Sequence, residues 1–167
     1  MALLAVGCGG SSGVDSGVDG TKKGSEVTED EAKKVCEATL DYQESQANKA
    51  DACRAAGFAM AAFSVATAAD DAAVVKACTD AVDACNSAEP QEPTTDPCAA
   101  AGPIAGCDNT VDEVEACLTE KIDAGAAALK DVPDCSELSK TYFETYEPSE
   151  PAEAEACKTV DPVCVPI

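Results

Sequence analysis

The sequence contains no histidine and no tryptophan, and only 11 of its 167 residues are lysine or arginine. Without histidine the chain cannot form a Ser-His or Cys-His catalytic pair, and it offers no imidazole ligand for a metal. A Gly-x-Ser-x-Gly elbow, a P-loop and a dinucleotide fingerprint are also missing. We therefore predict no catalytic residues, no metal ligands and no cofactor.

Positive charge is scarce relative to negative charge. Asp and Glu total 32, which gives a formal net charge of -21 at pH 7. A nucleic-acid site would have to oppose the electrostatic field of the whole molecule, so we exclude nucleic acid as a partner. Long apolar runs are missing too, because residues 55–69 fall short of the roughly 18 to 20 residues that span a bilayer. We expect this run to form a buried core helix instead.

Large apolar residues are few. Val, Leu, Ile and Phe account for 27 of the 167 residues, and such a low share combined with high net charge is typical of disordered chains. Eleven cysteines offset this deficit, and ten of them follow Cys8. An even number of cysteines suits an oxidising compartment, and each disulfide stabilises a fold by roughly 2 to 4 kcal/mol. We predict a folded domain that depends on five disulfides.

The first residues carry a short apolar run that ends in a small residue and a cysteine, Leu4–Cys8, followed by a Gly- and Ser-rich stretch. This pattern resembles the lipobox of bacterial lipoproteins. The resemblance implies that residues 1–7 are a signal remnant and that the Cys8 thiol is acylated and anchored in membrane lipid. It also implies that residues 8–26 are the lipidated cysteine and a flexible tether, and that Gly9 directs the protein to the outer membrane of a Gram-negative cell.

Helix start signals appear after this stretch. Thr28 with Glu31, and Thr110 with Glu113, match the capping box, in which the two side chains cap each other's backbone amides. Apolar residues with helical spacing follow each of them. We predict an all-α, disulfide-rich small bundle of about five helices, which begin near residues 28, 47, 70, 110 and 134.

Proline-rich stretches divide the chain. Four Glu-Pro, Asp-Pro or Gly-Pro pairs fall in residues 89–109, where they disfavour helix. We expect this stretch to connect two helical lobes, residues 27–88 and 110–147, which form one disulfide-bonded domain over 27–147. Residues 148–167 are rich in Pro and Glu and form an irregular tail held by cysteines.

One disulfide can be predicted from spacing. If the helices on either side of Ala69 form an antiparallel hairpin, Cys53 and Cys85 lie opposite each other, because each is 16 residues from the turn. The other connectivities stay open. The ten cysteines assigned to disulfides are Cys36, Cys53, Cys78, Cys85, Cys98, Cys107, Cys117, Cys135, Cys157 and Cys164.

Two other groups of residues could bind a ligand. Asp15, Asp19, Gly20 and Glu26 partly match an EF-hand loop, but Gly17 replaces a ligand, and a plain tether explains the stretch better. The aromatic residues in 142–146 could contact a partner or a glycan, although such a cluster more often covers a core.

No feature of the domain commits it to a reaction. We expect an exported, membrane-anchored lipoprotein that is a structural or binding element of the cell envelope, is not an enzyme, and has an envelope protein or glycan as its partner. The alternatives are an envelope hydrolase that uses surface carboxylates and a weak calcium- or other cation-binding protein.

Overall fold

The computed structural model describes residues 13–89, 95–147 and 154–165. Within these ranges the chain is all-α, with no strand and a single isolated bridge between Lys23 and Thr110. Five disulfides join the ten cysteines that follow Cys8. No helix in the described part of the chain is long and apolar enough to cross a membrane. The predicted fold class, an all-α disulfide-rich bundle, is confirmed.

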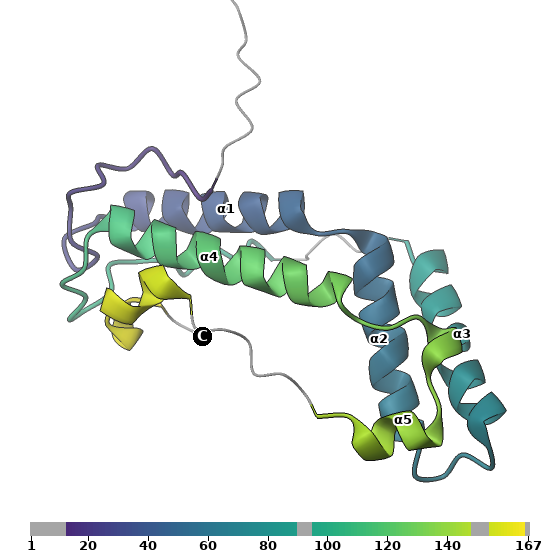
Figure 1. The fold of residues 1–167 in the computed structure, drawn as a ribbon. Helices are drawn as coiled ribbons and strands as arrows, with labels where there is room; N and C mark the ends of the chain where they lie inside the picture. The colour runs from purple at the N-terminus through teal and green to yellow at the C-terminus, as the bar shows by residue number, and fades with distance from the viewer. Residues whose placement is uncertain (1–12, 90–94, 148–153, 166–167) are drawn as a thin grey trace, which may run out of the picture. The chain divides into compact units, whose positions relative to one another are not determined.

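The described residues form five α-helices and three short 3-10 helices, whose arrangement Figure 1 shows. Most helices start where the sequence predicts, because capping side chains fix their first turns. Thr28 and Thr110 form the two predicted capping boxes with Glu31 and Glu113. The elements are α1 (Glu29–Gln46), α2 (Lys49–Ser64), α3 (Asp71–Ser87), α4 (Val111–Lys130), η1 (Cys135–Glu137), α5 (Lys140–Thr145), η2 (Glu155–Thr159) and η3 (Pro162–Cys164).

The chain divides into two compact units, and the division differs from the predicted lobes and connector. Unit 1 comprises the chain through Gln43, then Cys98–Glu120, and then the chain from Glu155. Unit 2 comprises Glu44–Pro97 and Lys121–Ala154. Each unit combines segments that are distant in sequence. Both cysteines of every disulfide belong to the same unit, so the disulfides link these segments.

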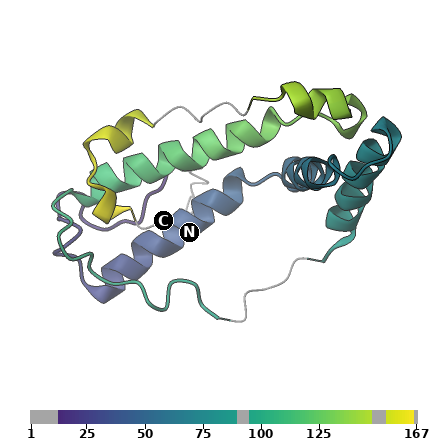
Figure 2. The ribbon, with the colours of Figure 1, turned by 90° about the horizontal axis from the view of Figure 1, so that it is seen from below.

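Unit 1 contains most of α1, the first half of α4, and the C-terminal turns η2 and η3. Its buried cluster consists of three half-cystines with Val114 and Val160. Figure 2 shows η2 and η3, in yellow, beside the first turns of α4. The segment predicted as an irregular tail thus packs into this core over residues 155–165, since Val160 is buried and Cys157 and Cys164 both form disulfides.

The predicted flexible tether is wrong for residues 13–26. We call residues 13–27 the N-terminal strap, and this strap packs on unit 1 with Val14 and Val27 buried. The Val14 amide donates to Thr119 Oγ1 at 2.8 Å, and the amides that open α4 at Val111 and Asp112 donate to strap carbonyls. The first amides of a helix have no partner within the helix, so the strap caps α4. The sequence of the strap gives no signal of this capping, because its backbone carbonyls accept the amides of α4.

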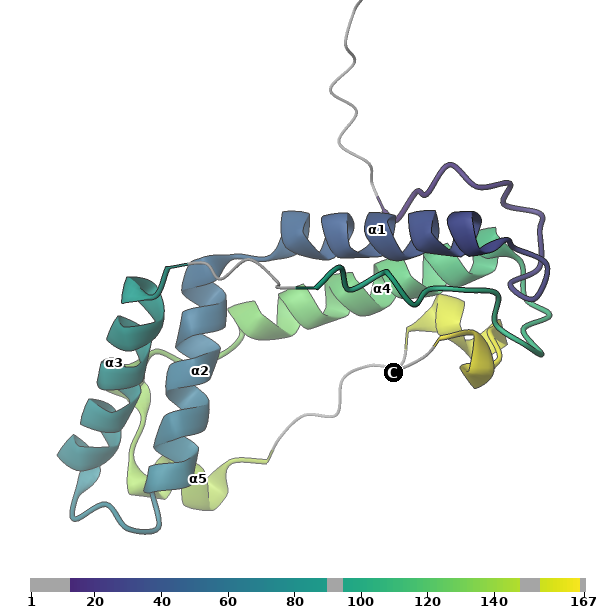
Figure 3. The ribbon, with the colours of Figure 1, turned by 180° about the vertical axis from the view of Figure 1, so that it is seen from behind.

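Unit 2 is built on the antiparallel hairpin of α2 and α3, which Figure 3 shows side by side. The helices approach closely at Gly57, and Cys53 and Cys85 form the predicted disulfide, with 5.4 Å between their Cα atoms. η1 contacts both helices, and Cys135 bonds to Cys78 of α3. The predicted fifth helix is split, because the segment from Asp134 forms η1 and then α5, which starts at the N-cap Ser139.

The prediction that residues 55–69 form a buried core helix is only partly right. Cys53, Gly57 and Ala61 of α2 are buried against α3 and η1. Elsewhere on the helix, Met60 is 50% exposed and Phe63 is 83% exposed. An apolar run without periodicity cannot indicate how many of its faces are covered, and here one face is left open.

Candidate functional site

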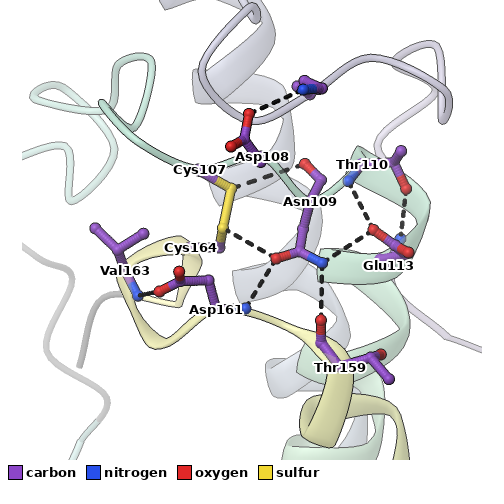
Figure 4. The surroundings of a disulfide bond; sticks show 10 residues. Cys107, Asp108, Asn109, Thr110, Glu113, Thr159, Asp161, Val163 and Cys164 are labelled. Atoms are coloured by element: carbon purple, nitrogen blue, oxygen red, sulfur yellow. Dashed lines mark hydrogen bonds and ion pairs between the residues drawn. A yellow bond between two sulfur atoms is a disulfide. The ribbon is translucent and has the colours of Figure 1, made fainter.

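The strongest constellation of polar side chains in the described residues surrounds Asn109, just before α4, in unit 1 (Figure 4). Its amide nitrogen donates to Glu113 Oε2 at 3.1 Å and to the Thr159 carbonyl at 3.0 Å. Its Oδ1 accepts the Asp161 amide at 2.8 Å and lies 3.6 Å from Cys164 Sγ. One side chain thereby joins the start of α4 to the C-terminal turns.

The backbone of Asn109 adds a further connection. Its carbonyl accepts the Gly24 amide of the strap at 2.9 Å. The Cys107–Cys164 disulfide lies directly beside it and is almost fully buried. Because three segments of the chain meet at Asn109, we call the group around it the Asn109 junction.

An open depression of about 580 Å³ lies at this junction. Acidic, amide and hydroxyl groups predominate in its lining, and one lysine contributes a positive charge. The lining residues are Asp108, Asn109, Glu113, Lys158, Thr159, Val160, Asp161 and Pro162.

Each carboxylate of the depression already has a partner in the protein. Asp108 accepts from the Lys23 ammonium at 2.9 Å, and Glu113 accepts from Asn109 and from the Thr110 amide. Asp161 caps η3 through a 3.0 Å bond from the Val163 amide. The carboxylates therefore hold the local structure together.

The electrostatics at the junction favour ionised carboxylates. Hydrogen bonding to Lys23 and its charge lower the pKa of Asp108, and hydrogen bonds from the Thr110 amide and Asn109 lower the pKa of Glu113. A general acid at neutral pH needs the opposite shift, toward a raised pKa. The arrangement suits a hydrogen-bonding surface better than proton transfer to a substrate.

In the described ranges, no three or more Cys, Asp or Glu side chains come together as a set of metal ligands. In the partial EF-hand stretch, Asp15 accepts the Gly17 amide and Asp19 accepts the Thr21 amide, so both carboxylates close local turns. Bonding to Thr21 also lowers the pKa of Asp19. The two carboxylates therefore stabilise turns within the strap.

The aromatic cluster lies in unit 2, where it joins α5 to α2. Phe58 contacts Tyr142, Phe143 and Tyr146, with ring centroids 5.3 to 6.3 Å apart. Phe58, Tyr142 and Phe143 pack against the buried cluster, whereas Tyr146 is 42% exposed. Most of the cluster therefore covers the core, and burial raises the pKa of Tyr142.

The sequence analysis predicted which cysteines form disulfides, but it did not predict the Asn109 junction. All ten cysteines assigned to disulfides are paired, whereas Cys8 lies outside the described residues. Asn109 has one local signal, its position before a capping box. Nothing in the sequence links it to the Thr159 carbonyl, which is 50 residues away. The four disulfides whose pairing the sequence left open are Cys36–Cys98, Cys78–Cys135, Cys107–Cys164 and Cys117–Cys157.

Comparison with known proteins gives no relative. No protein-family model, no curated protein and no solved structure matches the chain.

Proposed function

We propose that this chain is an exported lipoprotein, anchored in the bacterial envelope through an acylated Cys8, and that its domain is a structural or binding element of that envelope. The disulfides carry this proposal. Five of them in one small chain are consistent with export, because disulfides persist in oxidising compartments.

The pairing of the cysteines supports a separate role for Cys8. The other ten cysteines pair among themselves, so no cysteine of the chain is left for Cys8. An unpaired cysteine in an exported protein indicates an intermolecular disulfide, a free reactive thiol or a modified thiol. The lipobox-like residues before it favour acylation over an intermolecular disulfide.

A binding or structural role agrees with the chemistry of the domain. The carboxylates at the Asn109 junction have lowered pKa values or cap a turn, and none is arranged as a general acid. The depression there presents hydrogen-bonding groups beside the Cys107–Cys164 disulfide. Such a surface suits recognition of a polar partner, an envelope protein or a glycan.

The anchoring proposal is tested by expressing the full chain in a Gram-negative host and measuring the intact mass of the purified protein. We expect diacyl or triacyl mass on Cys8, loss of residues 1–7, and recovery in the outer-membrane fraction. Cys8→Ser should abolish the added mass and release the protein from membranes. A wild-type protein without acyl mass, or one joined to a partner through Cys8, would contradict the proposal.

The sorting prediction has its own control. Gly9→Asp changes no residue that the structure describes, and it should move the acylated protein from the outer to the inner membrane. Gly9→Ser is the matched substitution and should keep the distribution of the wild type. An unchanged distribution for Gly9→Asp would refute outer-membrane sorting while leaving the anchor itself intact.

A further inference from the structure

One face of α2 is apolar, exposed and regularly spaced. Four of its residues, Ala52, Ala56, Ala59 and Phe63, follow each other at intervals of four, three and four, and all four are exposed. We call them the α2 seam. Met60 lies beside the seam and is 50% exposed, while Phe63 is 83% exposed. This alternation of three and four is the spacing with which a helix meets a partner helix in a coiled coil.

The seam lies away from the contacts that α2 makes within unit 2. Cys53, Gly57 and Ala61 are the buried residues of α2, and they face α3 and η1. Phe58 packs with the rings of α5 on another side of the helix. The seam is thus a separate face of a helix whose position is fixed by the Cys53–Cys85 disulfide.

Charge makes α2 unusual in this chain. It carries two cations, Lys49 and Arg54, and one carboxylate, Asp51, which pairs with Arg54 at 2.7 Å. By contrast, α1 has six carboxylates and two lysines, α4 has five and two, and α3 has three and one. In a molecule of net charge -21, α2 is therefore the long helix of the described residues with the fewest carboxylates, so a second copy meets the least electrostatic repulsion along it.

The seam is also complementary to itself. If two α2 helices pair antiparallel about a two-fold axis between residues 57 and 58, Phe63 of each copy lies against Ala52 of the other. Ala56 then lies against Ala59, and almost the whole of both helices overlaps. A large side chain meets a small one at both ends, as interdigitated packing requires. The antiparallel arrangement also opposes the two helix dipoles.

We propose that two copies of this chain associate through an antiparallel pair of α2 helices, with Phe63 of each copy packed against Ala52 of its partner. A 16-residue helix is about 24 Å long. A single pair of such helices buries less than a standard interface, so we expect a reversible dimer with a Kd of about 10 to 100 µM.

The test is sedimentation velocity of the oxidised full chain carrying Cys8→Ser, which excludes association through an acyl chain or a Cys8 disulfide. We expect the weight-average mass to rise toward that of a dimer as the concentration increases. Phe63→Glu should raise the dimer Kd tenfold or more, because the carboxylate would be buried in the seam. Leu40→Glu, at another exposed apolar residue (38% exposed) on α1, should leave Kd unchanged.

A second variant tests the pairing itself. Adding Ala52→Lys to Phe63→Glu should recover dimer, because the two new charges meet across the two-fold axis. Adding Ala59→Lys instead should not recover it. The proposal would be overturned if the wild type stayed monomeric at concentrations above the expected Kd. It would also be overturned if the wild type and Phe63→Glu associated equally. Circular dichroism and disulfide mapping verify that each variant is folded.

Discussion

Gly57 is a position where α2 and α3 approach closely, and it allows a sharp test of the packing in unit 2. A Cβ atom placed there would lie 2.5 Å from Val82 Cγ2 and 2.9 Å from the Cys78 carbonyl oxygen. The carbonyl oxygen cannot move far, because it belongs to the α3 backbone and Cys78 is bonded to Cys135. Gly57→Ala therefore forces the two helices apart.

The magnitude follows from two opposing effects. Alanine in place of glycine favours the helix by about 1 kcal/mol, while overpacking a tight core costs typically about 1 to 3 kcal/mol. Because backbone as well as side-chain atoms are in the way at Gly57, we place the cost at the upper end of that range. The expected net effect is destabilisation by about 1 to 2 kcal/mol.

Gly125 is the matched control. It lies within α4, it belongs to the same unit as Gly57, and a Cβ atom there would meet nothing within 4 Å. Gly125→Ala should therefore stabilise the protein by up to about 1 kcal/mol. The assay is urea denaturation of the oxidised protein followed by circular dichroism at 222 nm. If Gly57→Ala stabilises as much as Gly125→Ala, the close approach of α2 and α3 is wrong.

Three further predictions concern the disulfides, a capping box and the strap. Six of the seven largest fully buried side chains are half-cystines, so complete reduction should abolish the cooperative thermal transition, and an unchanged midpoint would show that they are dispensable. Hydrogen bonds from Lys22 and Thr28 lower the pKa of Glu31 from 4.5 to about 2, so its contribution to stability is present above pH 4.5 and is lost as the pH falls toward 2. Glu31→Gln should destabilise the protein much more at pH 7 than at pH 2, and a pH-independent difference measured by thermal denaturation would contradict this role. Val14 of the strap is buried and its amide donates to Thr119 Oγ1, so this amide should exchange slowly with deuterium and Val14→Asp should speed exchange along the strap. Fast exchange in the wild type would restore the tether interpretation.

Much of the secondary structure could be predicted because the responsible interactions are local. The capping boxes at Thr28 and Thr110 involve residues three apart, and both form as expected. The Cys53–Cys85 bridge could also be predicted, since the α2–α3 hairpin converts distance from the turn into spatial proximity. Because the position of the α2–α3 turn was clear from the sequence, the spacing of the two cysteines was sufficient to predict this disulfide.

Sequence reasoning failed where backbone groups or distant residues decide the structure. The strap has too little apolar periodicity to suggest packing, yet its carbonyls cap the first amides of α4 and Val14 is buried against unit 1. The exposure of Phe63 was missed because an alanine-rich helix looks apolar on every side. The Asn109 junction depends on the Thr159 carbonyl, whose position is set by disulfides that spacing could not assign.

The sequence by itself determined an acidic, all-α chain without histidine chemistry, in which ten cysteines replace much of a conventional apolar core. It did so because charge, helix capping and cysteine count are properties of residues and their near neighbours. Only the tertiary structure decided which cysteines pair, that the strap and the C-terminal turns belong to unit 1, and that one face of α2 is left exposed. These features depend on contacts between segments tens of residues apart, where many alternative pairings satisfy the same local rules.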